Sequence, residues 1–500
     1  MKRVVRICIV EIGVTEDSTK RAGTASWVSS PRAVLAPLAL AQFICSFAGS
    51  NMNVMINDIS RDLHTDVKGV QTTITLFLLI MAVLMIPCSK LTDRWGRKRC
   101  LIGGLTVYGI GAVLSAVSPG LGVLILGYSV FQGVGTAFLI PPVYILTTMA
   151  FTSLESRAKA FGVISGMGGI GAAAGPLIGG AITSGISWRA AFVFQALVVA
   201  TIILLSRRVV DPVKPDSKRP FDAVGATLSA VGMFFVVFGI LQAGNNNTLL
   251  VISLALGVAF LAGFFLFIRS RERAGKEALL STDLFRNRAS NLGLITQNLQ
   301  WLLLMGASFV VSVFLQTERH YSAIKTGVIF TAATVGILVS SLAAERLAKR
   351  RQQKTLIATG FGTTVVGIGL LLGLVNVASS SAWAFAPGLL LIGLGVGVML
   401  TPSVNLVQSA FPEEKQGEIS GLSRSVSNLG SSFGTAIVGT ILVSDLVSGN
   451  GTYVAAMIVL AALALVGLGV ATMLPANPLQ GARAGVEPQS TAPDALDAAV

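Results

Sequence analysis

The chain has 500 residues, of which 53% are apolar and 12% are charged. Soluble domains carry about 25% charged residues, so this composition excludes an ordinary soluble protein and indicates one that spans a membrane. The net charge of +14 would suggest a nucleic-acid partner, but the placement of the basic residues, described below, argues against one. The sequence offers no nucleophile–base pair and no metal-ligand spacing, so we expect no enzyme activity, no cofactor and no metal.

Fourteen apolar stretches follow a polar tail over residues 1–33. A hydrocarbon core about 30 Å thick requires about 20 apolar residues of helix, and an open strand edge cannot be satisfied in lipid. We expect the spans to begin near residues 34, 70, 100, 121, 156, 188, 222, 248, 291, 327, 355, 383, 421 and 452. Residues 475–500, rich in Pro, Ala and Asp, are expected to form a disordered tail.

The basic residues predict the orientation of the spans. An even number of spans places both termini on one side of the membrane. If that side is the cytoplasm, only Arg61, Lys68, Arg189, Arg319 and Lys325 of the 37 Lys and Arg residues face outward. This asymmetry is the positive-inside rule. We therefore expect a multi-pass plasma-membrane protein with both tails in the cytoplasm, in contact with lipid and not with nucleic acid.

The sequence repeats itself at a spacing of about 260 residues. Residues 133–151 align with residues 393–411, and one span later three glycines recur. The matching pairs are Gly171 with Gly430, Gly175 with Gly434 and Gly180 with Gly439. We therefore expect an all-α membrane fold with 6+2+6 spans: six-helix bundles over residues 34–206 and 291–474, and an inserted pair with its loops over residues 207–290. Two parallel six-helix repeats are typical of a rocking transporter.

A charged segment, SKLTDRWGRKRCL at residues 89–101, lies between two apolar stretches. It resembles the loop 2–3 motif of the major facilitator superfamily, with Ser89 in place of the leading Gly. The matching residues are Leu91, Thr92, Asp93, Arg94, Gly96, Arg97 and Lys98. A positive-inside anchor would explain the basic residues but not the Asp or the Gly. The resemblance implies a cytoplasmic gate, in which Asp93 meets the start of span 13 near residues 420–423 and Arg97 holds that side closed.

Span 5 contains GGIGAAAGPLIGG at residues 168–180. Its glycines and proline resemble the antiporter motif of exporters in the same superfamily, at Gly171, Gly175, Pro176, Gly179 and Gly180. Small residues four apart line one helix face and permit close backbone approach, so generic helix packing is the alternative interpretation. The following segment, SWRAAFVFQ at residues 187–195, resembles a segment of the fourteen-helix drug:proton antiporters. Its Arg189 is either an interface anchor or part of a gate.

Two positions that are charged in that family are neutral in this chain. In span 4, Gln132, Gly133 and Gly135 match the family motif, but Ser129 stands where the family has Arg. In span 1, Ala48 stands where the fourteen-helix family has Asp. The span interiors contain no other carboxylate that could carry a proton, although Asp58 and Glu418 lie at span ends. A proton gradient is therefore implied by resemblance alone.

Neutral polar residues are the remaining candidates for a central cavity: Asn51, Asn53, Tyr128, Gln132, Gln297, Asn298, Trp301 and Asn405. Interhelical hydrogen bonding is the alternative role for each. The sequence and the resemblance together lead us to expect a monomeric secondary transporter that exports small hydrophobic or cationic compounds. Two alternatives stay open: an uncoupled facilitator or metabolite exporter with a neutral polar site, and a membrane sensor or scaffold that transports nothing.

Overall fold

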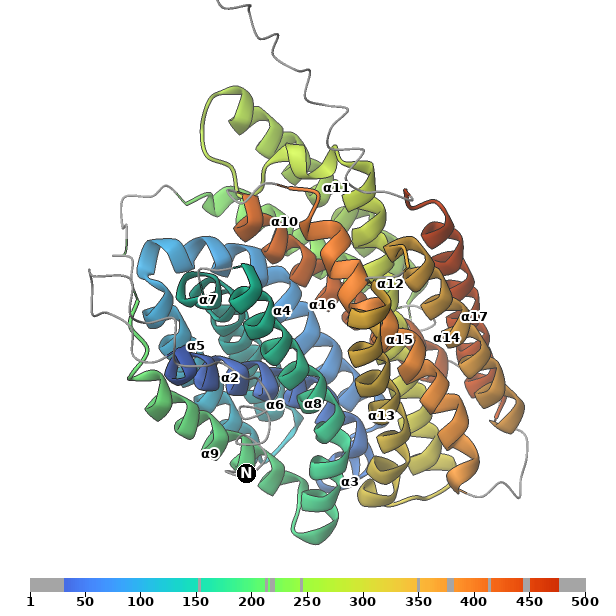
Figure 1. Ribbon diagram of the computed structural model, residues 1–500. Coiled ribbons are helices and arrows are strands. Elements are labelled where there is room, and N and C mark those ends of the chain that lie inside the picture. Colours follow the sequence, from blue (N-terminus) through green and yellow to red (C-terminus); the bar gives the residue numbers. More distant parts are fainter. Residues whose placement is uncertain are drawn as a thin grey trace, which may run out of the picture.

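The computed structural model describes residues 31–151, 154–211, 215, 221–242, 246–348, 351–375, 382–411, 415–443 and 450–475. Over these residues the chain is helical without strands, and fourteen helical segments are long and apolar enough to cross a membrane (Figure 1). Each begins within about four residues of its expected start. The predicted fold class is confirmed, whereas most of the two expected tails lies outside the described residues.

The first six spans and one short helix between them comprise ten helical elements. They are α2 (Pro31–Asn51), η2 (Met52–Val54), α3 (Ile56–Asp62), α4 (Val67–Trp95), α5 (Arg97–Ala116), α6 (Leu121–Leu124), η3 (Ile125–Gln132), α7 (Gly133–Ala150), α8 (Leu154–Gly185) and α9 (Trp188–Ser206). Span 1 consists of α2 and η2, and span 4 consists of α6, η3 and α7. The short helix α3 follows span 1 outside it. The helices that follow are α10 (Ala223–Leu241), α11 (Asn247–Arg273) and η4 (Thr282–Phe285).

The last six spans repeat this pattern. They comprise α12 (Arg288–Val313), η5 (Phe314–Glu318), α13 (Ala323–Ala348), α14 (Gln353–Val375), η6 (Ala382–Phe385), α15 (Ala386–Gln408), α16 (Gln416–Val443) and α17 (Gly451–Thr472). Short polar side chains start several helices by accepting a hydrogen bond from a backbone N–H of the first turn. Asp66 does so for α4, Ser187 for α9, Asp222 for α10, Asn246 for α11 and Asn287 for α12.

The internal repeat is visible in how glycines bring helices together. A Cβ atom at Gly104 of α5 would lie 2.8 Å from the carbonyl oxygen of Gly135 on α7. Its counterpart at Gly360 of α14 would lie 2.6 Å from the carbonyl oxygen of Gly395 on α15. Real Cβ atoms do not approach a backbone oxygen so closely, so both helix pairs need glycine at the crossing.

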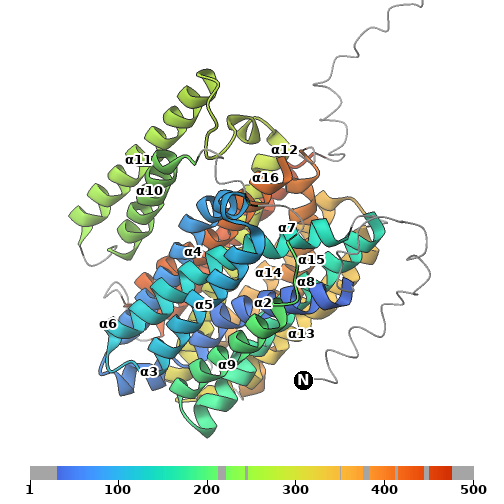
Figure 2. The ribbon, with the colours of Figure 1, turned by 90° about the vertical axis from the view of Figure 1, so that its left-hand side faces the viewer.

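The two six-helix halves meet along two helix pairs, α4 with α16 and α8 with α13. The inserted helices α10 and α11 pack on each other and stand beside the bundle, where α10 also touches α4 and α16 (Figure 2). Only 11% of the α11 span is buried, as expected of a helix that faces lipid. We call the end of the bundle at Trp95 and Gly96 the motif end, and the opposite end, where α3 and α6 lie, the far end.

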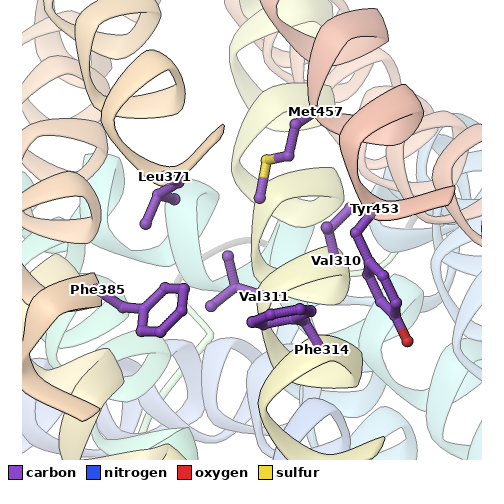
Figure 3. Close-up of a pocket in the computed structure, with 7 residues that line it drawn as sticks. All are labelled: Val310, Val311, Phe314, Leu371, Phe385, Tyr453 and Met457. Carbon is purple, nitrogen blue, oxygen red and sulfur yellow. The ribbon is translucent and has the colours of Figure 1, made fainter. Parts of the chain in front are cut away.

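The half built from α12 to α17 contains a small apolar cavity near the far end. Side chains from α12, η5, α14, η6 and α17 converge on it (Figure 3). They are Val310, Val311, Phe314, Leu371, Phe385, Tyr453 and Met457. Its volume is about 10 Å³ and its lining offers no polar surface, so it cannot hold an organic substrate and gives a water molecule no partners. It is a packing void.

Candidate functional site

The charged motif breaks the chain between α4 and α5 at Gly96. The backbone of Gly96 has φ +95° and ψ 138°, a conformation that only glycine adopts without strain. A Cβ atom there would also lie 3.0 Å from the Cγ atom of Pro215. The Gly of the motif is therefore required by the sharp turn, which a simple basic anchor would not need.

Arg97 and Lys98 fasten this turn to the end of α9. The carboxylate of Asp211 accepts hydrogen bonds from the backbone N–H of Arg97 at 2.7 Å and of Lys98 at 3.3 Å. The Arg97 guanidinium lies 3.8 Å from the other oxygen of the same carboxylate. Lys98 Nζ donates to the carbonyl of Arg207 at 2.8 Å. Asp211 thus neutralises the positive end of α5, and these contacts stay within one half.

Lys90, one helical turn before Arg94 on α4, forms a contact between the halves at the motif end. Its Nζ lies 2.6 Å from Oε1 of Glu418, near the start of α16. Glu418 Oε2 also accepts from the backbone N–H of Ser281 at 3.2 Å. The Asp93 side chain lies outside the described residues, so its expected contact with the same helix start stays a prediction. Arg94 is partly buried.

The glycines of span 5 have two neighbours. Gly171, Gly175 and Gly179 face α2, where a Cβ atom on the first would collide with the carbonyl of Phe43. Gly180 faces the other half, and a Cβ atom there would lie 2.5 Å from the carbonyl oxygen of Ala323 on α13. The carbonyl of Pro176 occupies the space above Gly327 of α13. The motif therefore places α8 against both halves at once.

The same close approach recurs in the second half. A Cβ atom at Gly430 of α16 would collide with the carbonyl of Asn298 on α12, just as one at Gly171 would collide with Phe43 on α2. In span 4, Gly133 packs against Ile80 of α4. These glycines match the small-residue faces that the repeat predicted.

Ser129 and Tyr128 form neutral hydrogen bonds where the family carries charge. The Ser129 hydroxyl donates to the carbonyl of Thr73 on α4 at 2.7 Å. The hydroxyl of Tyr128 donates to the carbonyl of Ala48 on α2 at 2.9 Å, and its ring stacks on Phe77 with centroids 4.6 Å apart. All these residues are buried. Spans 1, 2 and 4 are thus joined here by uncharged groups.

Asn53 lies at a contact between the halves at the far end. Its backbone carbonyl accepts from the Gln316 amide at 2.7 Å and from the hydroxyl of Ser312, both at the end of span 9. Asn57 donates in turn to the carbonyl of Gln316 at 2.6 Å. Asn53 contributes its backbone carbonyl to these bonds, whereas the sequence predicted that this residue lines a cavity.

The polar candidates of span 9 mostly hold helices together. Gln297 accepts from the hydroxyl of Ser423 at 2.8 Å, and Asn298 donates to the carbonyl of Val426 at 2.9 Å, so both join α12 to α16. Trp301 is partly buried. Asn405 on α15 is exposed, and its side chain forms no hydrogen bond with these described residues.

Asn51 and Gln132 differ from the others because their buried amides have no partner. Both side chains are fully buried, and neither the amide nitrogen nor the amide oxygen finds a protein partner within the described chain. Asn51 packs beside Gly179 of α8. A buried amide without a partner costs free energy unless a ligand, a water molecule or another conformation supplies one. These two residues are the strongest of the predicted cavity candidates.

A cluster of Gln42, Tyr144 and Arg424, which we call the Arg424 cluster, joins the halves inside the bundle. Arg424 of α16 donates to the hydroxyl of Tyr144 on α7, and its guanidinium carbon lies 4.8 Å from the centroid of the tyrosine ring. The Tyr144 hydroxyl donates to Gln42 Oε1 on α2 at 3.4 Å. Arg424 is absent from the predicted site residues, because the expected charged groups of the span interiors were carboxylates. The signal was one arginine well inside an apolar span.

Arg189 and Trp188 at the start of α9 bind within the first half at the far end. Both donate to the Asp62 carboxylate, from Trp188 at 3.0 Å, and Arg189 also donates to the carbonyl of Ser118 at 2.8 Å. The hydrogen bond from Arg189 holds the pKa of Asp62 below its ordinary value. These contacts support the anchor interpretation of Arg189.

Carboxylates in the described spans stand only at their ends, at Glu272, Glu318 and Glu418. Just outside span 1, burial raises the pKa of Asp58 above its ordinary value, and the nearby charge of Arg61 partly offsets this. The described residues also hold no group of His, Cys, Asp or Glu side chains that could bind a metal ion.

The chain is similar to known proteins in both sequence and fold. The family model described as the Major Facilitator Superfamily matches residues 38–435 and 293–494. A crystal structure of a peptide transporter, POT, in complex with sulfate superposes with a TM-score of 0.67 at 15% sequence identity, covering 92% of this chain and 96% of that one. At that identity the likeness concerns the fold alone.

Three curated relatives span most of the chain. The multidrug efflux pump LfrA of Mycolicibacterium smegmatis is 27% identical, over 85% of this chain and 82% of its own. The puromycin resistance protein pur8 of Streptomyces alboniger is 29% identical, over 80% of both chains. The riboflavin transporter RibZ of Clostridioides difficile is 25% identical, over 83% of this chain and 88% of its own.

Proposed function

The chain belongs to the major facilitator superfamily, and from this premise we propose that it is a secondary transporter that exports small organic compounds by alternating access. The observation that carries the proposal is the pair of contacts that close the two ends of the bundle. Lys90 and Glu418 join the halves at the motif end, and Gln316 joins Asn53 and Asn57 at the far end. Rocking of two rigid halves breaks one set while the other forms.

Export is supported by relatives and by the glycine face of α8. Two of the relatives above are a multidrug efflux pump and a puromycin resistance protein, and both cover at least four-fifths of the chain. The glycines of α8 let it lie against α2 and α13 together, as a helix at the boundary of two moving halves must. The riboflavin transporter among the relatives leaves the compound itself open.

The orientation and cellular setting belong to the same proposal. The motif end faces the cytoplasm, because the positive-inside rule places the loops rich in Lys and Arg there. The protein acts in the plasma membrane as a monomer, with the lipid bilayer around it and a small molecule as its only partner. The unpartnered amides of Asn51 and Gln132 offer hydrogen bonds to that molecule.

An uncoupled exporter is the second candidate, favoured by the neutral bonds of Ser129 and Tyr128. If protons drive transport, Asp58 just outside span 1 and Glu418 at the start of span 13 are candidate carboxylates to carry them. Efflux from proteoliposomes with and without an imposed pH gradient separates the candidates. A rate that follows the gradient supports coupling, and a rate that ignores it supports the uncoupled exporter.

The transport function itself is tested with a panel of dyes and antibiotics in proteoliposomes. We expect the wild type to move at least one compound against its gradient or faster than empty vesicles do. Asp93→Asn is expected to abolish that flux while the protein still inserts and elutes as a single species. If no compound moves, or if Asp93→Asn retains the cellular function of the wild type, the chain is a sensor or scaffold.

A further inference from the structure

A cation lies within a helix long and apolar enough to span the membrane, where the transport proposal does not require one. Arg424 is six residues into its span, Glu418–Val443, or about 9 Å along the helix. Every other Lys or Arg of the described spans lies within four residues of a span end. An ionisable side chain at such a depth is costly, and it marks a functional site unless a partner inside the protein neutralises it.

Among the described residues, no carboxylate pairs with Arg424. Its hydrogen bond goes to the hydroxyl of Tyr144, and its guanidinium lies over the tyrosine ring. Among the ion pairs of the described residues, none involves Arg424 with a carboxylate within 4 Å. A guanidinium has five N–H donors and stays charged at physiological pH. Of these donors, the described part of the chain engages one with the Tyr144 hydroxyl, which leaves most of the hydrogen-bonding capacity for another acceptor.

The Arg424 cluster also lies where a transported molecule would pass. Gln42 and Tyr144 belong to the first half and Arg424 to the second, so the cluster sits between the halves. Arg424 and Tyr144 are only partly buried, which leaves part of each accessible. The ring of Phe161 on α8 stacks on Tyr144 with centroids 5.9 Å apart. A positive charge and an aromatic surface are thus presented together.

We propose that the Arg424 cluster binds the carboxylate of an amphipathic organic anion whose aromatic body lies against the Tyr144–Phe161 stack. The proposal rests on the transport function and adds a charge preference to it. A carboxylate can accept two parallel hydrogen bonds from a guanidinium, which makes the pair strong and selective. An organic cation would meet a like charge, with no carboxylate in the interior of the described spans to attract it.

Binding of compounds that differ only in charge tests this preference. Purified protein in detergent is titrated with 2-naphthoate, 2-naphthamide and 2-naphthylmethylammonium, and with the same three forms of biphenyl and anthracene. We expect the wild type to bind the carboxylates about ten- to a hundredfold more tightly than the amides, and the ammonium compounds most weakly. Arg424→Gln is expected to remove the preference, and Arg424→Lys to retain part of it.

The matched control is Arg286→Gln, which removes a guanidinium whose side chain is 82% exposed on a loop and should leave the preference unchanged. If Arg424 only fastens the halves together, Arg424→Gln will weaken all three charge forms alike, and the anion site is overturned. Equal binding of the three forms by the wild type, or binding of none, overturns it as well.

Efflux of the same compounds from proteoliposomes separates this inference from the transport function. Efflux without charge preference would leave the exporter standing and remove the anion site. Charge-selective binding without efflux of any compound would support the site and contradict the exporter.

Discussion

Gly96 illustrates how one residue sets the position of the charged motif. Its backbone conformation turns the chain between α4 and α5 so that the first N–H groups of α5 reach Asp211. The motif's basic residues then lie at the end of α9 instead of continuing the α4 helix. The backbone turn thus requires the Gly of the motif, and the turn places the basic residues that follow it beside the Asp211 carboxylate.

Gly96→Ala is expected to destabilise the protein by about 1–3 kcal/mol, because a side chain would hold the backbone in a conformation that only glycine adopts freely. The added Cβ atom would also press on Pro215. Thermal unfolding in detergent measures the change. Gly103→Ala, on the exposed face of α5 with nothing within 4 Å, is the matched control and should be neutral or slightly stabilising.

Asp58→Asn is expected to stabilise the protein at pH 7. Burial raises the folded-state pKa of this carboxyl above its ordinary value of 3.8, so its ionised form is penalised in the folded protein at neutral pH. As pH falls through the raised pKa, the wild type binds a proton and regains that stability. The difference in melting temperature between variant and wild type should therefore shrink toward pH 3.5. A difference that grows on acidification would contradict the assignment.

At the scale of helices, small residues decide which elements can touch. The glycine face of α8 fits the backbone of α2, and the corresponding face of α16 fits α12, so one packing rule builds both halves. Between the halves, Gly180 and Gly327 allow α8 and α13 to meet at the far end. Toward the motif end, Gly162 and Gly166 face open space.

Gly171→Ala and Gly430→Ala are expected to cost about 1–3 kcal/mol each, because a methyl group would force the helices apart at a backbone carbonyl. Gly166→Ala, on the open part of the same helix α8, should cost nothing and can gain up to about 1 kcal/mol in helix propensity. Melting temperature and the yield of monodisperse protein report the differences. Equal behaviour of Gly171→Ala and Gly166→Ala would show that this face is not a tight helix contact.

The sequence predicts the helices and the glycine faces well because both depend on residues a few positions apart. Apolar length determines a span, and small residues four apart determine a face. The contact of Arg424 with Tyr144 joins residues 280 positions apart, and Asp211 binds Arg97 across 114 positions, so neither follows from a local pattern. The neutral bonds of Ser129 were equally hidden, since only the fold shows which carbonyl it meets.

At the scale of the whole molecule, the two halves meet through side-chain hydrogen bonds along α4 and α16 and at both ends, and through glycine contacts between α8 and α13. Glycine crossings hold each half together through backbone contact, which changes little without unfolding. The contacts between halves include an ion pair at the motif end and side-chain hydrogen bonds at the far end, which exchange easily with water. The ion pair and the hydrogen bonds at the two ends are the contacts that rocking can break while each half keeps its core.

Breaking the Lys90–Glu418 pair is expected to open the motif end. Both side chains are partly exposed, at 31% and 24%, so the pair should contribute about 0.2–1 kcal/mol and shift the closed population up to about fivefold. Spin labels placed on either side of the motif end measure the inter-half distance in Lys90→Gln, Glu418→Gln and the double variant.

The double variant should open the end no further than the more disruptive single variant, because the second change removes nothing that the first left in place. Lys415→Gln breaks an ion pair with Asp283 in the loop after the inserted helices, which does not join the two halves, and it serves as the control, with no change in distance expected. An additive effect of the two changes would mean that Lys90 and Glu418 act through different partners. In that case the hydrogen bond from the Ser281 backbone N–H to Glu418 would be the candidate contact that positions the start of α16.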